Sequence, residues 1–147
     1  MYSTPLEPYT YSIIGRKNKT NENNMIRVIL VDDQETVRKG LHMRLLLEPD
    51  IMVVGEASTG REALSLAQVL HPDVILMDIE MPEMDGITAT SALRAVLPQS
   101  AIVILSIHDD SITRMRAQTA GAAAYVEKRG KTEILLAVIR QAAYETP

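Results

Sequence analysis

Short apolar runs rich in β-branched residues alternate along the chain with segments whose apolar residues recur three or four positions apart. The runs predict strands over 26–31, 51–57, 73–78, 101–106 and 123–126. Most of these runs are apolar at successive positions rather than at alternate ones. Strands of this type belong to parallel sheets that helices cover on both sides.

The segments between the strands carry the apolar stripes of helices that cover such a sheet. Val37, Leu41 and Leu45 share one helical face, and this helix should stop near Pro49. A polar helix is predicted over 111–119. The other helices are predicted to bury Ala63, Leu64, Ala67 and Leu70; Leu93, Val96 and Leu97; and Ile134, Leu135, Val138, Ile139 and Ala142. The pattern therefore predicts an α/β domain with a five-stranded parallel sheet and helices on both faces.

Composition narrows the class of protein. The chain has 147 residues, the length of one ordinary domain; we expect 1–24 to be a flexible leader and 25–147 to be the folded domain. Its net charge of −4 argues against direct binding to nucleic acid. The lack of cysteine excludes disulfides, thiolate zinc sites and thiol catalysis. Without a membrane-spanning apolar run or a secretory signal, the expected location is cytoplasmic, with no membrane partner.

Polar side chains stand where four of the five predicted strands end. Asp32 and Asp33 follow the first strand, Asp78 ends the third, Ser106 ends the fourth and Lys128 comes just after the fifth. The carboxyl ends of parallel strands meet at one edge of the sheet, where ligands bind. Three carboxylates at that edge favour a hard cation, Mg²⁺ or Mn²⁺, over zinc. The set suggests phosphoryl chemistry, with one carboxylate as the nucleophile.

At these positions the chain resembles the receiver domain of two-component response regulators, over about residues 25–145. The resemblance is carried by Val31-Asp32-Asp33, the run from Met77 to Gly86, Leu105-Ser106, and Gly121-Ala122 followed by Tyr125 and Lys128. The stretches 53–57 and 106–110 look most like the branch with LuxR-type helix-turn-helix output domains. This resemblance implies a flavodoxin-like fold with strand order 2-1-3-4-5.

The same resemblance implies a role for each matched residue. Asp78 would be the phosphoacceptor, and Asp32 and Asp33 would hold the metal together with Asp78 and the backbone carbonyl of Glu80. Ser106 and Lys128 would contact the phosphoryl group, while Ser106 and Tyr125 would form the switch. A sensor histidine kinase or a small phosphodonor would supply the phosphoryl group. Residues 111–144 would be the output surface and a candidate homodimer interface, and DNA would be reached only through an output domain outside this chain.

Some positions differ from the commonest receiver pattern or vary within the family, and two other functions remain open. Ile107 stands where many receivers have a smaller residue, Arg129 where proline is frequent, and Glu80 and His108 where residues tune phosphoryl lifetime. One alternative is a metal-dependent phosphatase of the haloacid-dehalogenase type, although that family has Asp where this chain has Glu80. The other is an interaction module that is never phosphorylated. The expected protein is not an enzyme beyond self-phosphorylation and autodephosphorylation.

Overall fold

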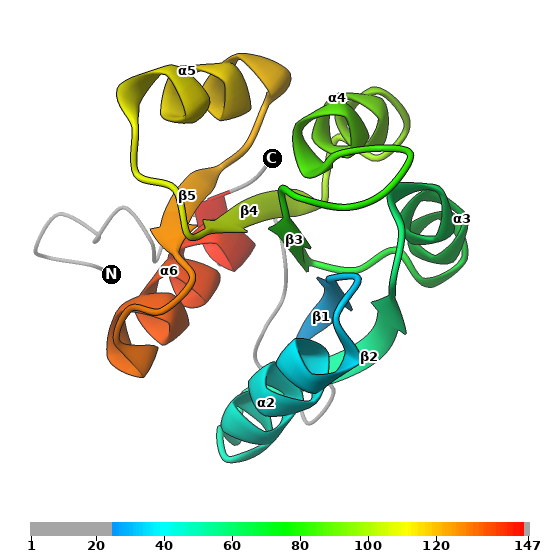
Figure 1. Ribbon diagram of the computed structural model, residues 1–147. Coiled ribbons are helices and arrows are strands. Elements are labelled where there is room, and N and C mark those ends of the chain that lie inside the picture. The colour runs from blue at the N-terminus through cyan, green and yellow to red at the C-terminus, as the bar shows by residue number, and fades with distance from the viewer. Residues whose placement is uncertain (1–24, 146–147) are drawn as a thin grey trace, which may run out of the picture.

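The computed structural model describes residues 25–145 of the chain. The predicted leader, 1–24, lies outside them, as do residues 146 and 147. Strands and helices alternate throughout the described part (Figure 1). In chain order they are β1 (Ile26–Val31), α2 (Glu35–Leu46), β2 (Ile51–Ala57), α3 (Gly60–Leu70), β3 (Val74–Asp78), α4 (Gly86–Val96), β4 (Ala101–Ser106), α5 (Ser111–Ala120), β5 (Ala124–Glu127) and α6 (Thr132–Glu145).

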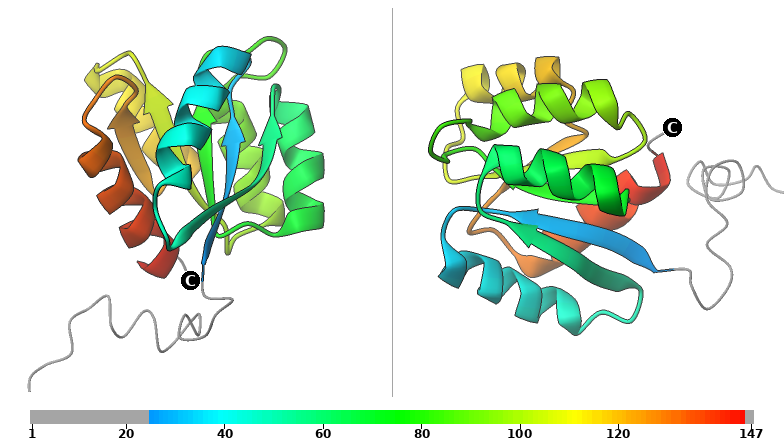
Figure 2. Two further views of the ribbon diagram at one scale, coloured as in Figure 1. Left: turned by 90° about the horizontal axis from the view of Figure 1, so that it is seen from below. Right: turned by 90° about the vertical axis from the view of Figure 1, so that its right-hand side faces the viewer.

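The strands form one parallel sheet in the order β2-β1-β3-β4-β5. Figure 2 (left) shows them side by side and running in the same direction. β1 pairs with β2 on one side and with β3 on the other, so Val28 lies opposite both Val53 and Val74. The predicted fold class and strand order are confirmed.

Helices cover both faces of the sheet, which explains why most of the strands are apolar at successive positions. Val28 and Leu30 of β1 pack into a cluster with α2 and α6, whereas Ile29 and Val31 pack into a second cluster with α3, α4 and α5. The two views of Figure 2 show the sheet between these layers. Successive residues of a strand point to opposite faces, so two covered faces require apolar residues at every position.

Two predicted core residues are wrong. Ile134 is 53% exposed, because the buried stripe of α6 is completed by Leu136 and Ala143, and Ile134 lies about 140° around the helix from its centre. Val96 is 50% exposed as the last residue of α4. β3 and β5 each begin one residue later than predicted. Within residues 25–145, none of the helices is long and apolar enough to cross a membrane.

Candidate functional site

Three carboxylates meet at the carboxyl edge of the sheet. Asp32 and Asp33 follow β1, and Asp78 is the last residue of the neighbouring strand β3. One oxygen from each carboxylate lies within 4.8 Å of the others. Asp32 and Asp78 are only 2% and 7% exposed, whereas Asp33 is exposed to solvent. Two of the three negative charges therefore stand where water screens them poorly.

Lys128 places an ammonium group between the two buried carboxylates. It comes directly after β5, and its backbone N–H donates to the Ser106 carbonyl at 2.8 Å. Its Nζ lies 2.7 Å from Asp32 Oδ2 and 3.1 Å from Asp78 Oδ1. One ammonium thus opposes three carboxylates, which leaves an excess of negative charge at this edge.

The burial and the excess of negative charge at this edge change the pKa values of Asp78 and Lys128. Burial, followed by the neighbouring charge of Asp32, raises the pKa of Asp78 to about 6, although Lys128 acts in the opposite direction. Burial lowers the pKa of Lys128, but its contacts with Asp32 and Asp78 outweigh burial and raise it overall. The lysine therefore stays charged, and a further positive charge beside Asp78 would favour the charged form of this carboxyl.

The turn after β1 is fixed by hydrogen bonds to Asp32. Asp32 Oδ1 accepts from the backbone N–H of Gln34 at 2.9 Å. Arg38, in the first turns of α2, donates from Nη1 to the Asp32 carbonyl at 2.6 Å and from Nε to Glu56 Oε1 at 3.1 Å. These bonds tie the acidic turn to α2 and to β2. The sequence interpretation missed Arg38, because a lone arginine on a helix gives no signal of which carbonyl it will reach.

Hydrogen bonds at the start of α4 fix the loop that follows Asp78. The Gly86 N–H donates to the Ile79 carbonyl at 2.8 Å, and a Cβ on Gly86 would collide with the Asp78 carbonyl. Asp85 begins α4 by accepting from the backbone N–H groups of Ile87 and Thr88 at 2.8 and 2.9 Å. Only glycine allows α4 to approach the end of β3 this closely, which explains its place in the run from Met77 to Gly86.

His108 contacts three other predicted site residues. Its backbone N–H donates to Ser106 Oγ at 2.9 Å, and its carbonyl accepts from the Tyr125 hydroxyl at 2.7 Å. Its ring Nε2 lies 3.2 Å from Glu80 Oε2. The Glu80 carboxylate therefore pairs with His108, and the acidic cluster itself consists of Asp32, Asp33 and Asp78.

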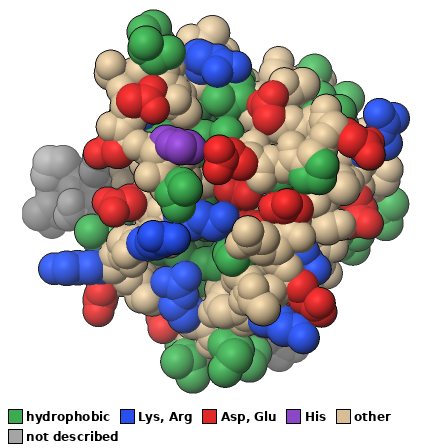
Figure 3. Space-filling model, viewed as in Figure 1, with side chains coloured by type: hydrophobic (Ala, Val, Ile, Leu, Met, Phe, Trp, Pro, Cys, Tyr) green, Lys and Arg blue, Asp and Glu red, His purple; other side chains and the backbone are tan. Residues whose placement is uncertain are grey.

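A cavity of about 540 Å³ opens beside the acidic cluster. Asp33, Asp78, Ser106, Lys128 and Arg129 all contribute to its lining, and it continues along α2. Figure 3 looks onto this edge of the sheet and shows acidic and basic side chains side by side. The acidic ligands are all oxygen atoms, which suits a hard divalent cation. The opening gives a small anionic molecule access to the Asp78 carboxylate.

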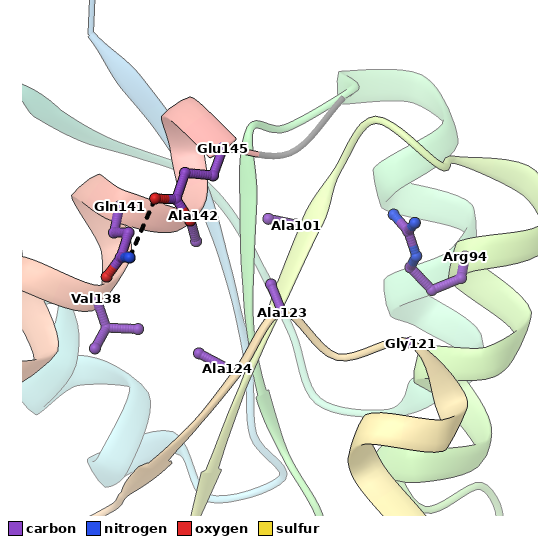
Figure 4. A pocket seen from close by; sticks show the side chains of 9 residues that line it. All are labelled: Arg94, Ala101, Gly121, Ala123, Ala124, Val138, Gln141, Ala142 and Glu145. Carbon is purple, nitrogen blue, oxygen red and sulfur yellow. Dashed lines mark hydrogen bonds between the residues drawn. The ribbon is translucent and has the colours of Figure 1, made fainter. Parts of the chain in front are cut away.

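A second cavity, of about 340 Å³, lies at the opposite end of β4 and β5. Small side chains such as Ala101, Ala123 and Ala124 form much of its lining (Figure 4). Arg94 on α4 and Glu145 on α6 border it from opposite sides of the sheet. Gln141 donates to Glu145 at 3.1 Å within α6. Arg94 and Glu145 do not point toward each other, so this cavity lacks the grouped charges of the acidic cluster.

The structure brings Asp32, Asp33, Asp78 and Lys128 into one cluster and places Ser106 on the cavity beside it. Tyr125 is further out, half-buried and bonded to the loop after β4. A five-stranded parallel sheet with acidic residues after β1 and at the end of β3 and a lysine after β5 is the arrangement that the resemblance to receiver domains predicts. The chain belongs to the family of response regulator receiver domains, whose model matches residues 28–140.

Individual relatives agree with this family. The transcriptional regulatory protein LiaR of Bacillus subtilis is 44% identical over 123 residues, which are 84% of this chain and 58% of that protein. The response regulator UvrY of Escherichia coli K12 is 36% identical over 116 residues, which are 79% of this chain and 53% of UvrY. The chain thus spans little more than half the length of these relatives.

Solved structures agree as well. The receiver domain of the putative response regulator NarL from Mycobacterium tuberculosis matches with a TM-score of 0.75 and 36% identity, over 80% of this chain and 96% of that one. A two-component response regulator of the LuxR family from Aurantimonas matches with a TM-score of 0.78 and 33% identity, over 81% and 85% of the two chains. The predicted family and branch are confirmed.

Proposed function

We propose that Asp78 accepts a phosphoryl group from the phosphohistidine of a sensor histidine kinase or from a small phosphodonor. The observation that carries this proposal is the position of the Asp78 carboxylate. It is buried at the end of β3, beside two further carboxylates and 3.1 Å from an ammonium group, and it borders a cavity open to solvent. A carboxylate that the fold keeps in one position, and that a small molecule can reach from solvent, is suited to act as a nucleophile.

In this reaction an Asp78 oxygen forms a bond to phosphorus as the bond between phosphorus and the leaving group breaks. The leaving group departs with the electron pair of that bond, and Asp78 becomes an acyl phosphate. Lys128 and the Ser106 hydroxyl then stabilise the negative charge on the phosphoryl oxygens. When water attacks phosphorus, the acyl-phosphate bond breaks, inorganic phosphate leaves and the Asp78 carboxylate is restored. The protein is then an acceptor with self-phosphorylation and autodephosphorylation rather than an enzyme acting on a separate substrate.

The residues at this edge fit a divalent cation. Asp32, Asp33, Asp78 and the backbone carbonyl of Glu80 would hold Mg²⁺, or Mn²⁺ in its place. Support comes from the excess of carboxylates over ammonium groups, from the oxygen-only ligand set and from the raised pKa of Asp78. When bound, the ion supplies positive charge that neutralises phosphoryl and carboxylate oxygens.

Phosphorylation would act through Ser106 and Tyr125 on the surface formed by residues 111–144. Both residues are bonded to His108, so a change at the acidic edge has a physical route to α5 and β5. We propose that this surface contacts an output domain or a second copy of the chain. DNA would be reached only through an output domain, as expected for relatives described as transcriptional regulators that are nearly twice as long as this match.

The direct test is intact mass measurement after incubation with Mg²⁺ and acetyl phosphate. We expect one added phosphoryl group on the wild-type chain and none on Asp78→Ala. The control Glu83→Gln removes an exposed carboxylate from the loop after β3 and should leave the adduct unchanged. An adduct of the same size on Asp78→Ala, or none on the wild type, would refute the proposal.

The same samples separate the two alternatives. Repeated turnover of an added phosphomonoester would indicate a phosphatase, and a chain that binds Mg²⁺ but never gains mass would indicate an interaction module. The phosphatase is the weaker alternative, because the Glu80 carboxylate lies against His108 instead of joining the three aspartates.

A further inference from the structure

We propose that Arg38 is a positioning residue for the metal site, because it holds the peptide that joins Asp32 and Asp33 in an arrangement that suits Mg²⁺ binding. This rests on the proposed function, in which these two carboxylates help to hold the ion. Arg38 contacts the backbone carbonyl of Asp32 rather than a carboxylate, so it acts through the backbone of the turn after β1.

The guanidinium group of Arg38 is fixed from two sides. Its Nη1 donates to the Asp32 carbonyl at 2.6 Å, and its Nε donates to Glu56 Oε1 at 3.1 Å. The Arg38 side chain is only 16% exposed. His42 Nδ1 lies 3.0 Å from the other oxygen of Glu56. Burial raises the pKa of Glu56, but its hydrogen bonds with His42 and Arg38 outweigh burial and lower it overall, so Glu56 stays charged.

The carbonyl that Arg38 binds belongs to the peptide between the two acidic residues. A peptide unit is planar, so the orientation of the Asp32 carbonyl also fixes the direction in which the chain enters Asp33. The Asp32 carboxylate has further contacts, with Lys128 and with the Gln34 N–H. Within the described part of the chain, no hydrogen bond or ion pair holds the exposed Asp33 carboxylate. The position of this carboxylate therefore depends on the backbone that Arg38 holds.

Arg38 also joins the turn to the helix and the strand beside it. The residue that precedes α2, Gln34, makes no side-chain hydrogen bond to the first turn of the helix. The Asp32 N–H attaches the turn to β2, because it donates to the Ala57 carbonyl at 3.1 Å. The bond from Arg38 to Glu56, the residue before Ala57, adds a second attachment. Without Arg38, the turn loses this second attachment to β2 together with its tie to α2.

Removal of Arg38 has two opposite effects on Mg²⁺ binding, so the sign of the change is informative. Loss of a positive charge near the acidic cluster strengthens the attraction for a cation. Loss of the hydrogen bond to the Asp32 carbonyl leaves the Asp33 carboxylate less well placed and weakens binding. Since Arg38 is paired with Glu56, the two charges largely cancel at the acidic cluster, and we expect the effect of position to prevail.

The test is titration of the protein with Mg²⁺, followed by the amide chemical shifts of residues around the acidic cluster. Arg38→Ala should raise the Kd for Mg²⁺ about three- to tenfold, less than the loss of a group bonded directly to a metal ligand typically causes. Arg38→Lys keeps the charge but lacks the planar group whose nitrogens reach the Asp32 carbonyl and Glu56, so its Kd should lie between those of Arg38→Ala and the wild type. If Arg38→Ala fails to fold, the Kd of Arg38→Lys should still exceed that of the wild type.

Two comparisons separate positioning from a general effect of charge. Lys39→Ala removes the same charge from the next position of α2, where Lys39 is exposed and paired with Glu35 at 3.4 Å, and should leave the Kd nearly unchanged. The double variant Arg38→Ala, Glu56→Ala has the net charge of the wild type but lacks the tie to the turn, so its Kd should stay above that of the wild type. Urea denaturation shows which variants are folded under the conditions of the titration.

The proposal is overturned if Arg38→Ala binds Mg²⁺ as tightly as the wild type or more tightly, or if Lys39→Ala weakens binding to the same extent. It is also overturned if the double variant regains the wild-type Kd, because the effect would then come from an unpaired Glu56 and not from the lost support of the turn. A wild type that does not bind Mg²⁺ refutes the proposed metal site, and this inference with it. A wild type that binds Mg²⁺ but gains no phosphoryl group refutes only the proposed acceptor reaction.

Discussion

Replacing Asp78 by Asn should stabilise the metal-free protein. The substitution keeps the shape of the side chain and leaves an oxygen that can accept from Lys128. It removes one of the three carboxylates that lie within 4.8 Å of one another. Folding brings these charges together and out of water, so the charged form of Asp78 opposes folding.

The size of the effect follows from the pKa. Burial and the charge of Asp32 raise the pKa of Asp78 from the ordinary value of 3.8 to about 6. A shift of about two pH units corresponds to at most about 3 kcal/mol at a pH above both values. Because solvent reaches the open edge of the site and screens the charges, we expect a gain of about 1–2 kcal/mol.

The sign of the pH dependence is fixed by the direction of this shift. Below about pH 3 Asp78 is protonated whether the chain is folded or unfolded, so the charge of Asp78 makes no difference in stability between wild type and Asp78→Asn. Between about pH 3 and pH 7 the unfolded chain loses this proton before the folded protein does. The advantage of Asp78→Asn should therefore grow through this window and then level off.

The assay is urea denaturation in EDTA at several pH values, repeated with Mg²⁺. Mg²⁺ should stabilise the wild type more than Asp78→Asn, because the variant has lost a ligand and part of the negative charge. Glu83→Gln serves as the control and should show neither effect. A variant less stable than the wild type at pH 7.5 in EDTA would show that the carboxylates are not in electrostatic conflict.

Three further predictions concern the fold around the site. Gly86→Ala should lower the free energy of unfolding by about 1–3 kcal/mol, because its Cβ collides with the carbonyl that ends β3; unchanged stability in urea would contradict this close approach. Leu93→Ala should lower the free energy of unfolding by about 2–5 kcal/mol, because Leu93 is fully buried. Val96→Ala, at the exposed end of the same helix, should lower it much less. Equal losses of stability in the two variants would show that the core is misassigned. The hydrogen bonds from Arg140 lower the pKa of Asp50, so Asp50→Asn should be less stable than the wild type by up to about 1 kcal/mol at pH 6. This difference should shrink as the pH falls through the lowered pKa, and a difference that stays constant down to the most acidic pH at which the protein is folded would argue against ion pairing.

Much of the fold could be predicted from the sequence, because burial on both faces leaves a clear signal. The strands were predicted to within one residue, since a covered parallel sheet requires continuous apolar runs such as the one in β3. The errors at Ile134 and Val96 arise where an apolar residue lies beside a buried stripe or at a helix end. In those places the sequence cannot tell which neighbour covers a side chain.

The candidate site could also be predicted only in part from the sequence. Residues at strand ends could be placed together in advance, because parallel strands bring their carboxyl ends to one edge. The pairing of Arg114 with Tyr125 and of His108 with Glu80 could not, because each pair joins segments whose separation depends on loop conformation. The single lysine between two aspartates also emerges only when distances are known.

The contact between Asp32 and Lys128 joins the first strand of the described chain to the last. During synthesis, an emerging polypeptide that already contains Asp32 and Asp78 still lacks the ammonium group that opposes them. If Lys128 takes part in the proposed reaction, acceptor chemistry would have to wait until β5 has been made and added to the edge of the sheet. A nascent or cleaved fragment that ends before β5 should be inert toward phosphodonors, so competence to receive a signal coincides with completion of the sheet.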